Sequence, residues 1–195
     1  MTTVARDALV IDGIACRWQA QVPDTLPLAR EWVGGITGNI AAQQLRRDPR
    51  GRPRLPEGMG DISWSHAGGR LLLAHAASGI VGVDVERLAR RVDALRVARR
   101  HFADAETGML EALDPTLRGA AFLCLWCAKE AVLKAHGHGI AFGLSRVAFT
   151  MEGDQPRMTR CDPALGAPAD WRLHAFAPEP GYLAVLARRD GILRG

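Results

Sequence analysis

The sequence predicts an α+β fold organised as two lobes, each built from strands and a helix. Short stretches rich in Val, Ile and Leu recur in both halves of the 195-residue chain, and each half also has a stretch with helical spacing of apolar residues. Hydrophobic residues make up 48% of the chain, which is enough for a sizeable core. We expect an N-terminal lobe at residues 1–82 and a C-terminal lobe at residues 83–195.

The N-terminal lobe is expected to contain three strands and one helix. Apolar patterning predicts strands at residues 8–16, 61–65 and 70–77. Residues 28–45 have helical spacing interrupted by glycines, which predicts an early helix. Gly68 and Gly69 allow a tight return between the second and third strands, so Ser65 and His66 would lie at a hairpin tip able to hold a phosphate. An ordinary loop histidine is the alternative interpretation of His66.

The C-terminal lobe is expected to carry most of the helical residues. A basic amphipathic segment at residues 87–100 is followed by a helix at residues 103–113 and a long helix from Pro115 to about Ala135. The remaining patterns are a strand at residues 144–151, a connection at residues 152–169, and two paired strands at residues 171–176 and 182–187.

Two acidic residues end the strand predicted at residues 80–85, close to the junction of the lobes. Asp84 and Glu86 are alternate residues of the sequence GVDVE, so their side chains share a face and repel unless a cation lies between them. Glu130 and Lys134 lie one helical turn apart in the long helix. Carboxylates with a lysine suggest a magnesium phosphate site. The alternative is that the two strand acids pair with arginines, while Glu130 and Lys134 form an ordinary helix pair.

The balance of charge favours an anionic ligand or an acidic partner. Lys and Arg total 25 against 21 Asp and Glu, which gives a formal net charge of +4, and Lys129 and Lys134 are the only lysines. The arginine-rich residues 46–56 are either a solvated loop or an arm facing a phosphate.

Other features of the sequence point to a soluble, cytoplasmic protein. The chain has no apolar run of about 20 residues, the length needed to cross a bilayer, and its N-terminus has no signal-peptide layout. Cys124 and Cys127 form a C-x-x-C pair inside an apolar helical run, so we expect buried thiols rather than a zinc or redox site.

Five short motifs then occur in an order that resembles the Sfp-type 4′-phosphopantetheinyl transferase family, over about residues 50–149. They are GRP at residues 51–53, ISWSH at residues 62–66, GVDVE at residues 82–86, Phe102 with Glu106, and WCAKEA at residues 126–131 with Lys134. Each motif alone is weak, and their common order makes the resemblance specific. The family pattern usually has lysine where Arg52 stands, and no motif covers residues 1–47.

The resemblance implies a pseudo-twofold pair of α+β lobes with the active-site cleft between them. It also implies magnesium-dependent transfer of the 4′-phosphopantetheine group of coenzyme A to a serine of an acyl or peptidyl carrier protein, with release of adenosine 3′,5′-bisphosphate. The residues that match the family motifs divide into three roles. The metal ligands would be Asp84, Glu86 and Glu130; the phosphate contact would be Lys134; and the residues that hold the nucleotide end of coenzyme A would be Arg52, Ser65 and His66.

The chemistry of phosphoryl transfer suggests how these side chains would act. Asp84, Glu130 and Lys134 are the expected catalytic residues: Glu130, or a water bound to the metal, would accept the serine proton, and Lys134 would offset phosphate charge. We expect a monomer that binds neither nucleic acid nor membranes. An acidic carrier protein would dock on residues 87–100 together with Met109 and Leu110.

Two other functions remain open from the sequence alone. A magnesium-dependent hydrolase of a nucleotide pyrophosphate could use the same acids with water as the nucleophile. A non-catalytic basic module that binds nucleic acid or an acidic protein would use mainly the arginines, and its binding would be indifferent to magnesium.

Overall fold

The computed structural model describes residues 8–38 and 40–191, which form a mixed α+β fold as predicted. The strands are β1 (Ala8–Ile11), β2 (Ile14–Ala20), β3 (Arg46–Arg47), β4 (Pro53–Arg54), β5 (Asp61–Ala67), β6 (Arg70–Ala76), β7 (Ile80–Arg87), β8 (Val147–Glu152), β9 (Gln155–Cys161), β10 (Trp171–Phe176) and β11 (Tyr182–Arg189). The α-helices are α1 (Thr25–Thr37), α2 (Ala94–His101), α3 (Asp104–Ala112) and α4 (Pro115–His136). Short 3-10 turns are Ile40–Gln44, Gly139–Phe142, Leu144–Arg146, Pro163–Leu165 and Pro168–Asp170.

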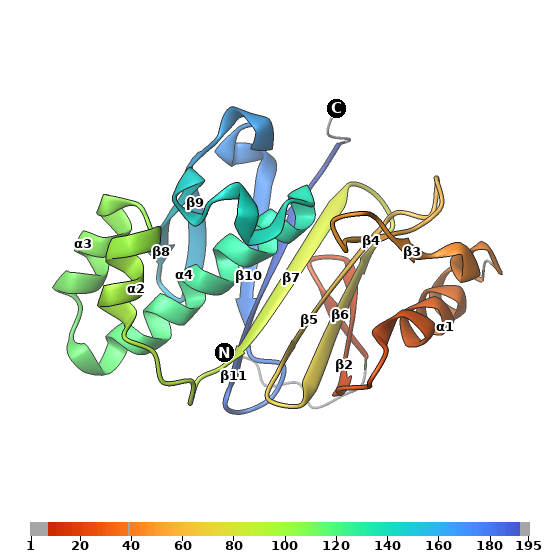
Figure 1. Ribbon diagram of the computed structural model, residues 1–195, viewed down its shortest axis with the longest axis horizontal. Helices are drawn as coiled ribbons and strands as arrows, with labels where there is room; N and C mark the ends of the chain where they lie inside the picture. The colour runs from red at the N-terminus through yellow and green to blue at the C-terminus, as the bar shows by residue number, and fades with distance from the viewer. Residues whose placement is uncertain (1–7, 39, 192–195) are drawn as a thin grey trace.

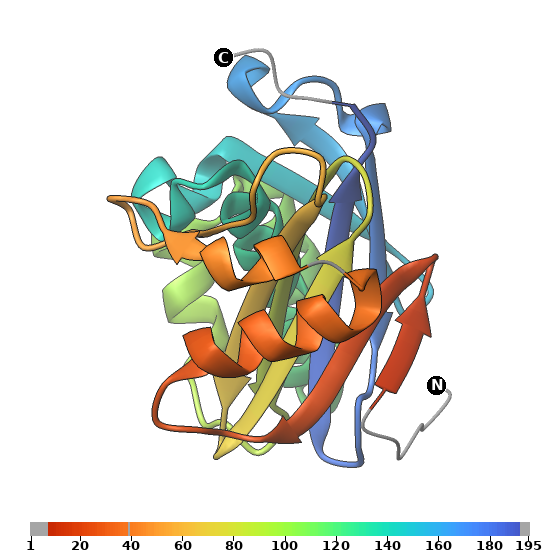
Figure 2. The same ribbon diagram turned by 90° about the vertical axis from the view of Figure 1, so that its right-hand side faces the viewer.

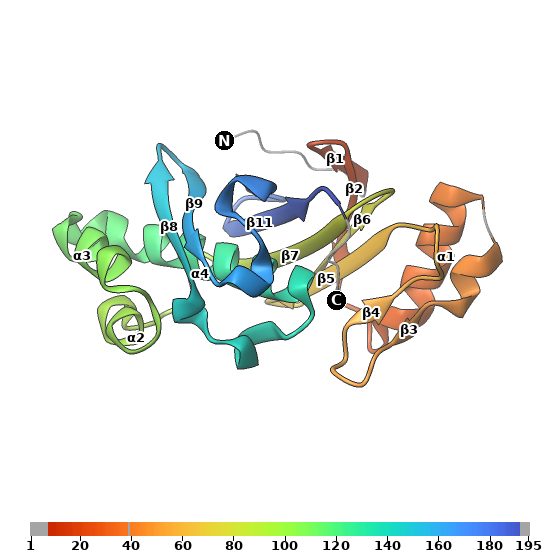
Figure 3. The same ribbon diagram turned by 90° about the horizontal axis from the view of Figure 1, so that it is seen from above.

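Two antiparallel sheets meet in the middle of the molecule. One has the order β1-β2-β6-β5 and the other the order β10-β11-β7, and β5 and β7 lie side by side at their junction (Figures 1 and 3). Side chains of β5 replace a backbone ladder there: Asp61 Oδ2 accepts a hydrogen bond from Val81 N at 2.7 Å, and Ser63 Oγ accepts one from Val83 N at 3.1 Å. These bonds fix the position of β5 relative to β7, the strand that carries Asp84 and Glu86.

Helices cover the two sheets at opposite ends of the molecule. Helix α1 lies across the sheet that contains β5 and β6 (Figure 2) and buries Ala29 and Val33 in a cluster with Ile62 and Leu71. Helix α4 packs against β7 and β11, and α2 and α3 lie beyond it (Figure 3). A further cluster combines residues of both sheets, and the predicted lobe boundary between residues 82 and 83 falls inside β7. The division into two lobes therefore stays a prediction.

The long helix α4 begins and ends where its sequence predicts. The side chain of Asp114 accepts a hydrogen bond from Thr116 N at 2.8 Å, and Pro115 occupies the first turn, where a missing N–H costs nothing. Gly137 ends the helix in the left-handed region with φ +96°. Cys124 and Cys127 are buried on this helix as free thiols, as expected, and burial raises the pKa of Cys127 well above its usual value.

A single glycine allows α4 to lie close to the acidic strand. A Cβ atom at Gly82 would lie only 1.9 Å from the carbonyl oxygen of Ala131, a distance that no side chain can tolerate. Because Glu130 immediately precedes Ala131, this close approach also brings Glu130 to the strand that carries Asp84.

Two predictions for the N-terminal half were wrong in detail. The strand expected at residues 8–16 is a hairpin of β1 and β2, with the turn at Asp12 and Gly13, both at positive φ. The helix expected at residues 28–45 ends at Thr37 because Gly38 adopts φ +63° and ends it in the left-handed region. Residues 1–7, on which the expected absence of a signal peptide depends, lie outside the described residues.

Four predictions for the rest of the chain also need correction. The connection expected at residues 152–169 contains β9, which pairs with β8. Its strand pattern is weak because only Pro156 and Met158 are buried, and proline is uncommon inside a strand. The strand expected to start at residue 144 starts at Val147. The strand expected at residues 80–85 continues to Arg87, and the segment at residues 87–100 is helical only from Ala94. In the described part of the chain, no helix is long and apolar enough to cross a membrane.

Candidate functional site

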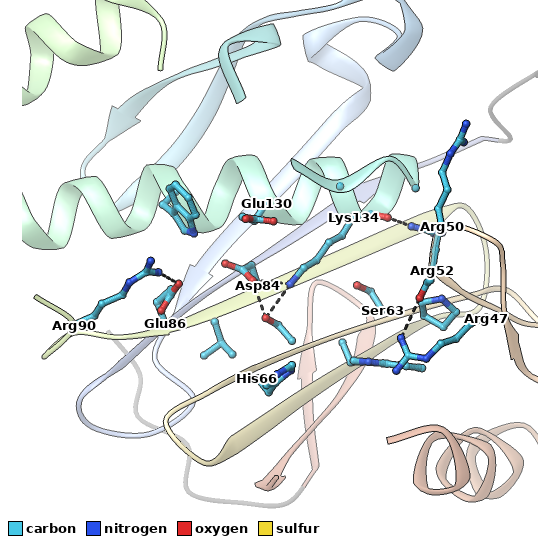
Figure 4. Close-up of a pocket in the computed structure, with 18 residues that line it drawn as sticks. Arg47, Arg50, Arg52, Ser63, His66, Asp84, Glu86, Arg90, Glu130 and Lys134 are labelled. Carbon is cyan, nitrogen blue, oxygen red and sulfur yellow. Dashed lines mark hydrogen bonds and ion pairs between the residues drawn. The ribbon is translucent and has the colours of Figure 1, made fainter. Parts of the chain in front are cut away.

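A pocket of about 500 Å³ opens at the junction of the sheets, between β5, β7, α4 and the β3–β4 hairpin. Figure 4 shows Glu86 and Arg90 at one end, Arg47, Arg50 and Arg52 at the other, and Asp84, Glu130 and Lys134 between them. The pocket is lined by Arg47, Arg50, Gly51, Arg52, Pro53, Ser63, Trp64, Ser65, His66, Asp84, Val85, Glu86, Arg90, Trp126, Glu130, Lys134, Gly137 and Gly139. All the site residues predicted from the sequence therefore line one cavity.

Asp84 stands at the centre of this pocket. Strand β7 buries its side chain to 8% exposure. Its Oδ1 accepts hydrogen bonds from Lys134 Nζ at 2.6 Å and from Ser65 Oγ at 2.7 Å. Its Oδ2 is buried and has no hydrogen-bond partner among the described residues. A buried carboxylate oxygen without a donor is costly, so this atom is poised to accept a cation or a proton donor.

Lys134 bridges the helix to both central strands. Its Nζ donates to Asp84, to Ser65 Oγ at 2.9 Å and to the carbonyl oxygen of Val83 at 3.3 Å. The alternative expectation, an ordinary pair with Glu130 one turn away on α4, is wrong because the ammonium group binds Asp84 instead. Lys134 is nevertheless 28% exposed, so its remaining surface faces the pocket.

The two glutamates are destabilised as anions. Burial, with the negative charge of Asp84 second, raises the pKa of Glu130 from 4.5 to about 7. Burial also raises the pKa of Glu86, although the neighbouring Arg90 guanidinium opposes this shift. Glu130 can therefore hold or release a proton near neutral pH, which is the property required of a general base.

The carboxylates fit a divalent cation chemically, although they do not surround one point. In residues 8–38 and 40–191, no three acidic, histidine or cysteine side chains are arranged as a metal site. Glu86 instead pairs with Arg90, as the alternative of arginine pairing predicted. A cation would give the unpartnered Oδ2 of Asp84 a partner and relieve the repulsion that raises the pKa of Glu130. Oxygen ligands of this kind suit Mg²⁺.

The three residues expected to hold the nucleotide differ in their surroundings. The expectation that Ser65 and His66 lie at a hairpin tip is wrong, because β5 continues to Ala67 and both residues pair with β6 inside the strand. His66 is exposed at the rim, whereas Ser65 is buried and its hydroxyl group already contacts Asp84 and Lys134. Arg52 is buried, pairs with Asp61 and also donates to the backbone carbonyl of Lys134. All three line the pocket, and their contacts with a nucleotide remain predictions.

Sequence reasoning did not assign several charged and aromatic groups in the pocket. Arg90 lies over the ring of Trp126, 5.5 Å from its centre, in addition to its pair with Glu86. Arg47 lies 4.9 Å from the ring centre of Trp64. The arginine-rich residues 46–56 had indicated a possible role for Arg47 in binding phosphate. Nothing in the local sequence indicates that Trp64 on β5 would lie against its guanidinium group.

Two motif residues outside the pocket form a buried ion pair. Lys129 and Glu106 both have fully buried side chains, and Lys129 Nζ lies 2.7 Å from Glu106 Oε2. These two residues connect α4 to the start of α3, so their place in the motifs is explained by structure.

The expected docking face for a carrier protein is partly wrong. Leu110 is fully buried in the core between α3 and α4, and Met109 is half-buried, so Leu110 cannot contribute to a surface. Arg91 and Arg99 are exposed, and Arg99 pairs with Glu111 at 2.7 Å. The exposed arginines before and on α2 are therefore available as a surface, with Leu88 exposed and Leu110 excluded.

Comparison with known proteins places residues 80–186 in a described family. A family model described as the 4′-phosphopantetheinyl transferase superfamily matches residues 80–186, which include β7 and α4. The 4′-phosphopantetheinyl transferase HetI of Nostoc sp. is 28% identical over 166 residues, 82% of this chain and 67% of HetI. A Synechocystis sp. protein provisionally named as a 4′-phosphopantetheinyl transferase is 36% identical over 107 residues, 53% of this chain.

The 4′-phosphopantetheinyl transferase of Bacillus subtilis is 28% identical over 102 residues, 52% of this chain. The matched stretches span 44% of the Synechocystis protein and 43% of the Bacillus protein, less than half of either. The family match covers more than half of this chain and includes Asp84, Glu86, Glu130 and Lys134. The chain therefore belongs to the 4′-phosphopantetheinyl transferase superfamily.

Proposed function

We propose that this chain transfers the 4′-phosphopantetheine group of coenzyme A to a serine hydroxyl of an acyl or peptidyl carrier protein, with Mg²⁺ as cofactor, and releases adenosine 3′,5′-bisphosphate. The observation that carries this proposal is the placement of three carboxylates and Lys134 in one pocket whose opposite end is lined by arginines. The names of the relatives support the same reaction.

Asp84, Glu86 and Glu130 are the residues that would hold the metal. The cation would supply positive charge to the pyrophosphate oxygens of coenzyme A, which is most of what phosphoryl transfer requires. Arg90 engages Oε1 of Glu86, so Glu86 would bind the cation through Oε2, or through both oxygens once Arg90 releases it. Once released, Arg90 would be able to turn towards the substrate phosphates, because it lines the same pocket.

Glu130 is the residue best suited to take the serine proton. In the metal-free protein burial raises the pKa of Glu130 to about 7, so its carboxylate is a stronger base than that of an ordinary glutamate, and it lies beside Asp84 and Lys134 in the same pocket. The serine oxygen would form a bond to the phosphorus next to pantetheine, and the bond from that phosphorus to the bisphosphate leaving group would break. The serine proton would pass to Glu130.

Lys134 would stabilise the charge that develops on the phosphate oxygens. Its ammonium group is held by Asp84, Ser65 and a backbone carbonyl, so its position is set before substrate binds. Arg47 and Arg50 at the opposite end of the pocket would bind the phosphates of the nucleotide. The substrate would then lie along the junction of two lobes related by a pseudo-twofold axis.

An acidic carrier protein would approach over the exposed arginines at α2. Replacing Arg91 and Arg99 with glutamate should raise the KM for the carrier protein much more than the KM for coenzyme A, because neither residue lines the pocket. Equal effects on the two constants would count against this docking face.

The test of the proposed reaction is incubation with coenzyme A, Mg²⁺ and a panel of carrier proteins, followed by intact-mass measurement of each carrier. A gain equal to one phosphopantetheine group supports transfer. Breakdown of coenzyme A with no gain on any carrier would instead indicate hydrolysis of the pyrophosphate.

A further inference from the structure

Arg52 occupies an unusual position for an arginine that lines a phosphate pocket. Its side chain is only 4% exposed, and its guanidinium group is placed between two acceptors from different elements. Nη2 pairs with the carboxylate of Asp61 on β5, and Nη1 donates to the backbone carbonyl of Lys134 on α4. Both terminal nitrogens of the guanidinium group are thus engaged by the protein.

Asp61 extends this connection to the acidic strand. The same Oδ2 atom that pairs with Arg52 also accepts the 2.7 Å hydrogen bond from Val81 N on β7. Asp61 is itself buried, at 7% exposure. One carboxylate oxygen therefore links the β3–β4 hairpin, through Arg52, to the strand that carries Asp84.

The contact with the carbonyl of Lys134 lies at the end of α4. The last four carbonyls of a helix have no partner within the helix, and a cation there also interacts favourably with the helix dipole. A Cβ at Gly137, the residue that ends α4, would lie 3.1 Å from Cδ of Arg52, so the two segments are in close contact. Arg52 therefore contacts this last helical turn through both its guanidinium group and its aliphatic stem.

We infer that Asp61 and Arg52 are positioning residues, which hold the last turn of α4 against β5 and β7 so that Lys134 reaches Asp84. This inference rests on the proposed transfer reaction and adds Asp61 to the residues that reaction needs. Arg52 acts through Lys134, and contact with the nucleotide falls to Arg47 and Arg50, which are exposed on the same hairpin.

The test compares Arg52→Gln, Asp61→Asn and the double variant. The Asp61→Asn change keeps the shape of the aspartate side chain, and the amide oxygen can still accept the hydrogen bond from Val81 N, so only the ion pair is removed. We expect each single variant to lower kcat on the order of tenfold to a hundredfold, as small misplacements of catalytic groups do, with the KM for coenzyme A changed less than about threefold. The kcat of the double variant should be no lower than that of the less active single variant, because the two residues form one unit.

A direct nucleotide contact predicts a different pattern. Arg52→Gln would then raise the KM for coenzyme A, whereas Asp61→Asn would leave it unchanged or lower it by freeing the guanidinium group. That result would overturn the inference. The double variant also keeps the test informative if a single variant fails to fold, since it leaves no buried unpaired charge.

Hydrogen exchange gives a readout that does not depend on transfer. Each single variant should speed exchange of the amides in the last turn of α4, including the Gly137 N–H bonded to Leu133 O, relative to the middle of the helix. Unchanged exchange there would contradict the inference even in an active enzyme. If the wild-type protein transfers nothing, the proposed function fails while this exchange experiment still decides the structural role.

An exposed ion pair provides the matched control. Arg157 and Glu152 pair on the surface of the β8–β9 hairpin at 57% and 60% exposure, away from the pocket. Arg157→Gln and Glu152→Gln, singly or together, should change neither kcat nor exchange in α4. A comparable loss of kcat in this control would show that the effect at Arg52 is not specific.

Discussion

Replacing Lys129 with methionine should destabilise this protein severely although it does not touch the pocket. Lys129 is fully buried, and its ammonium group donates to Glu106 Oε2 at 2.7 Å and to the carbonyls of Leu144 at 3.0 Å and Val147 at 2.5 Å. Methionine keeps most of the volume of the side chain and removes all three hydrogen bonds. The carboxylate of Glu106 then remains buried without a cation.

The expected size of this effect follows from the burial of the pair. Removing one partner of a buried ion pair costs about 3–5 kcal/mol. Glu106 would retain only its bonds from the backbone amides of Ala103 at 2.9 Å and Phe149 at 3.0 Å. With a shift of about 2–4 °C per kcal/mol for a chain of this size, the melting temperature should fall by roughly 6–20 °C.

Urea denaturation of the wild-type protein and of Lys129→Met measures the loss directly, as a lower midpoint with the same slope. Adding Glu106→Gln should recover part of the stability, because the double variant has no unpaired buried charge. Arg157→Met on an exposed ion pair is the control, with an expected loss of at most about 1 kcal/mol. A loss below about 1 kcal/mol at Lys129, or additive losses in the double variant, would refute the assignment of this buried pair as a stabilising unit.

Two further predictions concern the junction of β7 and α4. Gly82→Ala should lower the free energy of unfolding by about 1–3 kcal/mol or more, because the added Cβ would clash with the carbonyl oxygen of Ala131 on α4. Gly119→Ala, in open space on α4, is the control and should be neutral or stabilising by up to about 1 kcal/mol. Equal effects of the two changes in urea denaturation would argue against the close approach. Because the pKa of Glu130 is raised in the folded protein to about 7, its contribution to stability is fully present below 4.5 and is lost as pH rises towards 7. Glu130→Gln should remove this part of the pH dependence. The measurement compares the free energy of unfolding of the wild-type protein and of the variant at about pH 5 and about pH 8 in magnesium-free buffer. The same change with pH in both proteins would contradict the raised pKa.

The parts of the site that the sequence predicted are those with strong local signals. Alternation places Asp84 and Glu86 in one strand, and Pro115 and Gly137 mark the ends of the helix that carries Glu130. Such patterns involve only residues that are close in the sequence, so they can be recognised without knowledge of the tertiary structure. The five ordered motifs then connected these two elements.

The parts that the sequence could not predict depend on contacts between distant segments. The bonds of Lys134 to Ser65 and of Arg52 to Asp61 arise from the meeting of two sheets, which no local pattern specifies. Lys129 adjoins Glu130 in the sequence, yet it turns into the core because successive helical residues point in different directions. Leu110 was assigned to the surface because the sequence pattern did not show that another helix, α4, would cover it.

Magnesium-dependent transfer, measured for the wild-type protein and for Asp84→Ala, decides whether the acidic pocket performs the proposed reaction. A carrier protein is incubated with coenzyme A in Mg²⁺ or in chelator, its intact mass is measured over time, and circular dichroism checks that the variant is folded. We expect a gain of one phosphopantetheine group with the wild-type protein in Mg²⁺ only, and none with the folded variant. Full activity of Asp84→Ala, or equal activity in chelator, would contradict the proposed role of Asp84 and the metal.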